Sequence, residues 1–171
     1  MNAAALADEK TSNRKSEIEG SLQLVSFQLL DEQYGVEIGK VREIILFGEI
    51  TQLPQTPSYV KGLINLRSTV IPIIDLKLRF GLPESEPTDE TRIIVTQVEG
   101  KTIGVIVDAV SEVMRVSQDQ ISPPPPTVAG CAEDYLVGLA QRDNELLILL
   151  DIEKILVEEM VEAISAVNTN E

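Results

Sequence analysis

The residues with the most direct catalytic potential are Asp75 and Asp151, which occupy equivalent positions in a repeated stretch. Residues 62–75 and 138–151 have the same length, open with Gly-Leu and end in an aliphatic run followed by aspartate. Two carboxylates related by a repeat could share one proton, as in aspartic proteases. That chemistry needs a tight Asp-Thr/Ser-Gly loop, whereas each aspartate here precedes a predicted helix and aspartate is a preferred N-cap. The sequence therefore predicts two helix caps, with an aspartic-type hydrolase as the alternative.

The sequence lacks the residues that other common catalytic mechanisms require. The chain contains no histidine, which excludes Ser-His-Asp and Cys-His catalysis, histidine metal sites and a phospho-accepting histidine. Cys131 is the single cysteine and has no histidine or second cysteine to activate it. Gly35 and Gly104 lie within strand patterns, where a β-bulge is the expected role, and no phosphate-binding loop or dinucleotide fingerprint is present. We therefore expect no enzyme, no metal and no cofactor.

Composition limits the partners and the compartment. The 171 residues fit one domain or two small halves. The formal net charge of -14 argues against nucleic acid and against an anionic membrane surface. No apolar run approaches a membrane span, and the N-terminus lacks the apolar core of a signal peptide. The single cysteine suits a reducing compartment, so we expect a cytoplasmic protein.

The strand pattern occurs twice. Alternating residues from Leu22 to Ile38 predict a β-hairpin, residues 40–47 a short helical or bent segment, and residues 70–74 a buried strand before a short helix. After the acidic, Pro-bearing link 83–91, the same order returns, with offsets of 69 residues in the hairpins and 76 in the Gly-to-Asp stretches. The seven extra residues fall in or near residues 122–130, which contain four consecutive prolines.

This duplication predicts the domain organisation. Residues 1–20 form a disordered tail, and residues 21–157 form one domain with barrel halves at 21–82 and 91–157. Residues 158–171 hold the end of a C-terminal helix and a tail. The helix carries an apolar stripe of Ile152, Ile155, Leu156, Met160, Val161 and Ile164. The fold class is all-β with short helices.

Two features point to binding rather than catalysis. Arg67 has no counterpart in the second copy, where Asp143 stands, so it is either a binding residue or a solvated turn residue. Val41 and Ile44 are repeat-equivalent to Val110 and Val113. These four are either ordinary core residues or the lining of an apolar groove that takes a partner's helix.

A series of motifs between Leu22 and Leu156 resembles the CheW-type chemotaxis coupling proteins. They are Phe27-x-Leu29, Tyr34-Gly35-Val36, Val41-Arg42-Glu43-Ile44, Val60-Lys61-Gly62-Leu63-Ile64-Asn65-Leu66-Arg67, Val70-Ile71-Pro72-Ile73-Ile74-Asp75-Leu76, Gly104-x-x-Val107-Asp108-x-Val110-Ser111-Glu112-Val113, Tyr135-Leu136-x-Gly138, and Leu149-Leu150-Asp151-Ile152. The resemblance implies two five-stranded, SH3-like β-barrels. It also implies a non-enzymatic scaffold that joins the cytoplasmic tip of chemoreceptors to the CheA histidine kinase, recruited to membrane receptor arrays without membrane insertion. The same module could serve a non-flagellar chemosensory pathway.

The resemblance also implies two sets of site residues. The receptor is expected in the groove between the barrels, against Val41, Glu43, Ile44, Gly62, Arg67, Gly104, Val110 and Val113. The regulatory domain of the kinase is expected on outer faces and loops, at Ile38, Ile50, Leu53, Ile121 and Pro123. One position departs from the family's usual Asn-Leu-Arg-Gly, because Ser68 replaces the glycine. If that position needs a positive φ, serine costs about 1 kcal/mol and could redirect Arg67.

Overall fold

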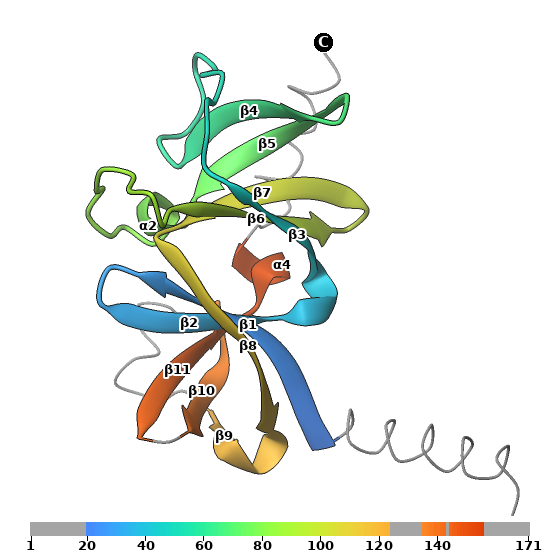
Figure 1. Cartoon of the computed structure of the whole chain (residues 1–171), viewed down its shortest axis with the longest axis vertical. Coiled ribbons are helices and arrows are strands. Elements are labelled where there is room, and N and C mark those ends of the chain that lie inside the picture. Colours follow the sequence, from blue (N-terminus) through green and yellow to red (C-terminus); the bar gives the residue numbers. More distant parts are fainter. Residues whose placement is uncertain (1–19, 124–134, 143, 156–171) are drawn as a thin grey trace, which may run out of the picture.

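The chain folds into two β-sheets with short helices between and beside them (Figure 1). The structure is a computed structural model that describes residues 20–123, 135–142 and 144–155. In chain order, its elements are β1 (Ser21–Leu29), β2 (Glu32–Glu37), the 3-10 helix η1 (Ile38–Lys40), β3 (Val41–Leu46), β4 (Val60–Leu66), β5 (Thr69–Asp75), α2 (Leu76–Arg79), β6 (Arg92–Val98), β7 (Lys101–Val107), β8 (Ala109–Ser117), the 3-10 helix η2 (Gln118–Gln120), β9 (Ile121–Ser122), β10 (Leu136–Arg142), β11 (Glu145–Leu150) and α4 (Ile152–Ile155). The predicted all-β fold with short helices is confirmed.

The sheets do not follow the two halves of the sequence. One sheet has the order β8-β1-β2-β11-β10-β9 and the other β3-β6-β7-β5-β4. The hairpin β1–β2 of the first copy therefore lies among strands of the second copy, and the hairpin β6–β7 of the second copy lies among strands of the first. This corrects the expected barrel halves 21–82 and 91–157, because each sheet is built from both.

The register shows that this exchange is symmetric. Gly35 of β2 lies opposite Leu149 of β11 in a parallel pair, and Gly104 of β7 lies opposite Ile73 of β5 in another. These two contacts are equivalent under the 69- and 76-residue offsets of the repeat. The two copies are thus related by an approximate two-fold axis that exchanges their hairpins.

In both sheets, the segment that follows one outer strand pairs with a strand at the opposite side of the sheet. Thr51, which follows β3, exchanges two backbone hydrogen bonds with Leu63 of β4, at 2.9 and 2.8 Å. The second copy repeats this closure, because β9 follows β8 and pairs Ser122 with Leu139 of β10. The closing segment of the first copy is only this isolated bridge, so the two sheets differ in strand number by one.

The glycines that open the two repeated stretches allow this closure. Gly62 has a φ of 143°, and a Cβ there would lie 1.9 Å from the carbonyl oxygen of Thr51. A Cβ at Gly138 would lie 2.7 Å from the carbonyl oxygen of Ser122. Glycine is needed at both positions because the closing backbone occupies the place of a side chain.

Three apolar clusters fill the molecule. One lies on one face of the six-stranded sheet, around Leu24, Val116 and Leu149. A second lies on one face of the five-stranded sheet, around Ile73, Ile93 and Val95. The third joins the two sheets and includes residues of both short α-helices; its members are Val25, Phe27, Leu29, Val36, Ile74, Leu76, Ile94, Val98, Ile103, Val105, Val107, Leu136, Leu150, Ile152 and Ile155. We call this third group the central cluster.

Two local predictions need correction. Residues 41–46 form strand β3 rather than a helix, although the bend that was predicted as the alternative is present as a register shift between Val41 and Glu43. Gly35 and Gly104 are not at bulges; they make room for close neighbours, since a Cβ at Gly104 would lie 2.6 Å from Ile73. The register shifts lie instead between Val41 and Glu43, between Ser26 and Phe27, and beside Gly62 and Gly138.

Some predictions fall outside the described residues. They concern most of the N-terminal tail, most of the four-proline run, Cys131, Asp143 and the helical stripe beyond Ile155. Within the described residues, no helix is both long and apolar enough to cross a membrane.

Candidate functional site

Asp75 and Asp151 cap helices, as predicted. Oδ1 of Asp75 accepts hydrogen bonds from the backbone N–H groups of Lys77 and Leu78, at 2.9 and 3.3 Å. Oδ1 of Asp151 accepts from the backbone N–H groups of Glu153 and Lys154, at 3.0 and 3.3 Å. Both carboxylates satisfy amides at the start of a helix, a role typical of aspartate N-caps. The described residues also hold no group of three or more His, Cys, Asp or Glu side chains arranged for a metal.

The exposed apolar candidates lie at the edge of the central cluster. Ile44 lies on β3, the edge strand of the five-stranded sheet, directly opposite Ile94. Val113 lies on β8, the edge strand of the six-stranded sheet, directly opposite Val25. Directly opposed residues share a face of the sheet, and Ile94 and Val25 both belong to the central cluster. Ile44 and Val113 are nevertheless 39% and 51% exposed. Each therefore lies on a sheet face that is buried at its centre and reaches solvent at its edge.

Val41 and Val110 lie deeper on the same two strands. Both are half-buried and pack against the central cluster. Together with Ile44 and Val113 they form what we call the rim, two residues from each edge strand at repeat-equivalent positions. The inner pair therefore packs with the core, as the first interpretation predicts, whereas the outer pair is open to solvent.

Arg67 lies at the tip of the β4–β5 hairpin and forms an ion pair with Glu43 of β3. These two predicted site residues come from opposite edges of the five-stranded sheet, so their contact adds to its closure. The Arg67 side chain is 71% exposed, and an exposed pair of this kind contributes at most about 1 kcal/mol. Most of the guanidinium donors remain available to a partner.

The turn that presents Arg67 is strained. Leu66 and Thr69 are paired, which leaves a two-residue loop whose φ angles are 50° for Arg67 and 69° for Ser68. Positive φ at both positions defines a type I′ turn, which favours Asn and Gly. Ser68 therefore occupies a position with a positive φ, which glycine would adopt without strain. Despite this strain, the Arg67 side chain pairs with Glu43.

Two other predicted receptor residues lie inside the structure. Gly62 is buried where the sheet closes, and Gly104 is buried between Ile73 and Ile93. Any effect of these glycines on a partner therefore acts through the shape of the five-stranded sheet, since neither one is exposed.

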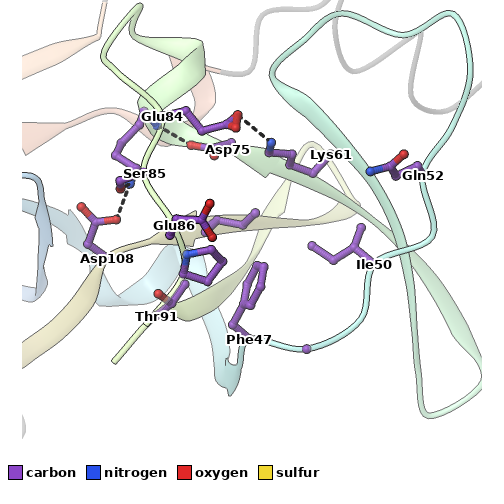
Figure 2. A pocket seen from close by; sticks show the side chains of 14 residues that line it. Phe47, Ile50, Gln52, Lys61, Asp75, Glu84, Ser85, Glu86, Thr91 and Asp108 are labelled. Atoms are coloured by element: carbon purple, nitrogen blue, oxygen red, sulfur yellow. Dashed lines mark hydrogen bonds and ion pairs between the residues drawn. The ribbon is translucent and has the colours of Figure 1, made fainter. Parts of the chain in front are cut away.

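The five predicted kinase residues are spread over both sheets. Ile38 packs against the central cluster and Ile121 against the core of the six-stranded sheet. Leu53 is half-buried in the loop after β3, and Pro123 is exposed. Ile50 lines a cleft of about 600 Å³ beside the 84–91 segment (Figure 2). The structure does not gather the five into one surface patch.

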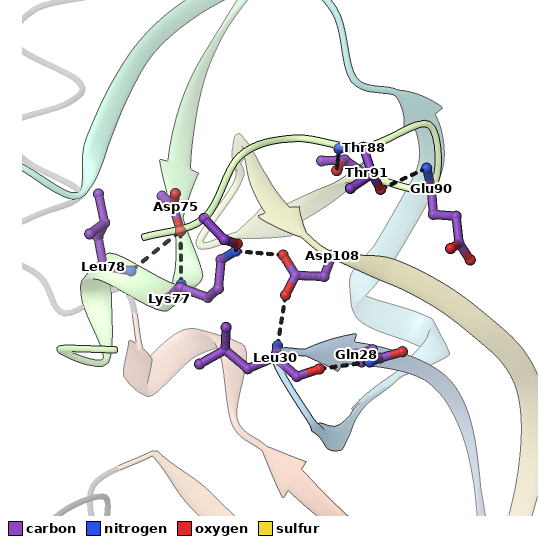
Figure 3. A network of polar contacts seen from close by, with 10 residues as sticks. Gln28, Leu30, Asp75, Lys77, Leu78, Thr88, Glu90, Thr91 and Asp108 are labelled. Atoms are coloured by element: carbon purple, nitrogen blue, oxygen red, sulfur yellow. Dashed lines mark hydrogen bonds and ion pairs between the residues drawn. The ribbon is translucent and has the colours of Figure 1, made fainter. Parts of the chain in front are cut away.

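A buried ion pair was missed by the sequence analysis. Nζ of Lys77 on α2 lies 2.6 Å from Oδ1 of Asp108, and the Lys77 side chain is only 3% exposed. Oδ2 of Asp108 accepts from the backbone N–H of Leu30, at 2.7 Å, and Lys77 also contacts the hydroxyl of Ser85. Figure 3 shows this network joining the β1–β2 turn, α2 and the start of β8. In the sequence, Lys77 is one of two basic residues that alternate with apolar residues in Leu76–Phe80, and nothing in this pattern pointed to Asp108.

A related pair with reversed charges joins α4 of the second copy to η1 of the first. Glu153 of α4, the repeat equivalent of Lys77, lies 2.6 Å from Lys40 of η1. This hydrogen bond is the main reason that the pKa of Lys40 lies above its usual value. The pair is exposed, in contrast to Lys77 and Asp108, and it ties α4 to the start of β3.

The fold and the site define a class of protein. Two curled sheets share a central cluster, apolar residues emerge at its rim, and the carboxylates of Asp75 and Asp151 are occupied in helix caps. They define a small module of two curled β-sheets in which each aspartate caps its own helix, so the aspartic-hydrolase alternative is dropped. The family model of the CheW-like domain matches residues 23–160. The chain belongs to the CheW-like family.

Named relatives agree over most of their lengths. The chain is 39% identical over 137 residues to the chemotaxis protein CheW of Treponema pallidum, covering 78% of this chain and 81% of the relative. It is 37% identical over 137 residues to the chemotaxis protein CheW of Klebsiella aerogenes, covering 80% and 82%. The crystal structure of the scaffolding protein TtCheW from Thermoanaerobacter tengcongensis superposes with a TM-score of 0.75 at 36% identity, covering 81% of this chain and 94% of that one. The chain is thus a chemotaxis scaffold protein.

Proposed function

We propose that this protein couples the cytoplasmic tip of chemoreceptors to a CheA-type histidine kinase, in the cytoplasm and at membrane receptor arrays. The observation that carries the proposal is the match to the CheW-like domain across residues 23–160, which span both sheets. The coupler acts by binding alone, so a receptor change reaches the kinase as a change in how the kinase is held.

The rim is the receptor site in this proposal. A receptor tip is a helical hairpin, and an amphipathic helix binds by placing apolar side chains against an apolar surface. Ile44 and Val113 supply exposed apolar surface on the two edge strands. Arg67 supplies a cationic group near one end of this surface, held beside Glu43 on β3.

The kinase site lies elsewhere, on the outer faces and loops of the two sheets. Ile50 and Ile121 occupy related places, because each lies in the segment that closes its sheet. Both are half-buried, so they combine packing inside their own sheet with a surface that a partner can reach. Separate sites for the two partners allow both to bind at once.

Binding of the two partners tests the proposal. The full chain is mixed with a receptor tip fragment, with the kinase regulatory domain, and with both, and each mixture is analysed by co-sedimentation and calorimetry. We expect binding of each partner alone and a ternary complex with both. Failure of both partners to bind at tens of micromolar would refute the coupling function, and mutual exclusion would refute separate sites.

A further inference from the structure

A cleft of about 600 Å³ lies beside the five-stranded sheet, and none of the edge-strand residues assigned to the receptor lines it. One wall is the loop after β3, and the other is the acidic 84–91 segment that follows α2. Figure 2 shows Phe47 and Ile50 on the loop side and Glu84, Ser85 and Glu86 on the other. The cleft is lined by residues of the first copy, of the link between the copies, and of the second copy, which contributes Ile106 and Asp108.

The loop side of the cleft is apolar. Phe47 and Ile50 are half-buried and pack against the apolar cluster of the five-stranded sheet. Ile106 forms part of the lining and is almost fully buried, and Pro87 contributes from the opposite wall. These side chains give the cleft an apolar surface against which an aliphatic side chain of a partner can pack.

Nearly all charged groups of the lining are already engaged. Lys61 pairs with Glu84 at 3.0 Å, and Lys77 pairs with Asp108. Asp75 is occupied by the cap of α2. Glu86 is the exception, because in the parts of the chain that the structure describes its carboxylate has no ion pair or hydrogen bond.

The remaining charge is therefore negative. The lining holds four carboxylates and two amines, and Asp89 and Glu90 follow on the same segment. An acidic partner would meet repulsion here, since both amines are already neutralised. A guanidinium or ammonium group would pair with Glu86 and could lie against the ring of Phe47.

We propose that this cleft docks a surface segment of a partner protein that presents an arginine or lysine next to an aliphatic residue. The aliphatic side chain packs between Ile50 and Pro87, and the cationic group pairs with Glu86. This contact adds Glu86 and Pro87 to Ile50, which the proposed coupling function assigns to the kinase surface, and it involves neither the rim nor Arg67.

The test uses a short peptide as the probe. The full chain, labelled with ¹⁵N, is titrated with Ac-Gly-Arg-Leu-Gly-NH₂, and amide shifts are followed by NMR. We expect weak, saturable binding that shifts the amides of Phe47, Ile50 and Glu86. The peptide Ac-Gly-Glu-Leu-Gly-NH₂ should bind at least about five-fold more weakly, since it reverses the charge that the cleft selects.

A matched pair of variants tests whether the Glu86 carboxylate binds the arginine of the peptide. Glu86→Gln should weaken binding of the arginine peptide by about five-fold. Glu90→Gln, on the same exposed segment but outside the lining, should leave it unchanged. Absence of shifts at the cleft, equal binding of the two peptides, or equal effects of the two variants would each overturn the proposal. None of these results depends on receptor or kinase binding.

Discussion

Lys77 and Asp108 form a buried ion pair that joins helix α2 to the junction between β7 and β8. Lys77 belongs to α2, whereas Asp108 ends the turn between β7 and β8 and also binds the N–H of Leu30 beside the six-stranded sheet. The Asp108 side chain is 25% exposed. Loss of the carboxylate would leave the Lys77 ammonium buried without a counter-charge.

Asp108→Ala should therefore destabilise the protein by about 3 kcal/mol, as expected when one partner of a buried pair is removed. Urea unfolding measures the change in the free energy of unfolding. Glu153→Ala is the matched control, because it removes the exposed pair with Lys40 and should cost less than about 1 kcal/mol. Equal losses in the two variants would show that burial does not distinguish the pairs.

Gly62→Ala should disrupt closure of the five-stranded sheet. The added methyl group would overlap the carbonyl of Thr51, and the φ of 143° disfavours any other residue. We expect a loss of about 3 kcal/mol or more in the free energy of unfolding. Gly39→Ala is the control, since nothing lies within 4 Å of a Cβ there; a comparable loss in this variant would refute the closure argument.

Ser68→Gly should stabilise the protein by about 1 kcal/mol, because glycine adopts the positive φ of this type I′ turn without steric cost. Asn144 occupies the equivalent position with a φ of 68°. Asparagine tolerates this conformation better than serine, so Asn144→Gly should gain less. Thermal unfolding compares the two variants, and a larger gain at Asn144 would contradict the assignment of strain to Ser68.

Val113→Glu should weaken binding of a receptor tip fragment by ten-fold or more, about 1.4 kcal/mol, because it places a charge in an apolar contact. Binding of the kinase regulatory domain should be retained. Val137→Glu provides the control, since Val137 on β10 is similarly exposed, at 48%, and lies outside the rim. Equal effects at the two positions would remove the rim from the receptor site. Val110 is less suitable, because it packs against the core.

The repeat carried most of the fold information in the sequence. Alternating hydrophobic residues and the Gly-to-Asp stretches predicted the two hairpins, the buried strands and the capping roles of Asp75 and Asp151. The exchange of hairpins could not be predicted, because local periodicity is identical whether a strand pairs within its own copy or with the other. Strand β3 was misassigned because three- and four-residue spacings also occur in a short strand with a bulge.

The candidate site was only partly predictable. Arg67 was singled out because the second copy lacks a counterpart, and Glu43 was named from the motif resemblance. Their contact could not be predicted, because it depends on sheet closure, which joins residues 24 positions apart. Gly62 and Gly104 belong to the family motifs because their neighbours leave no room for a side chain. A motif alone does not show which of its residues are exposed and which are buried. The Lys77–Asp108 pair was missed because its partners come from different copies of the repeat.

The exchanged hairpins mean that neither half of the chain holds a complete set of strand partners. Cutting the backbone in the 83–90 link would leave β1–β2 in one fragment and the strands that flank this hairpin, β8 and β11, in the other. Each fragment alone would expose the unpaired edges of its strands, and the two together would restore every pairing of the intact chain. The protein is in this respect a covalently linked dimer of its own repeat.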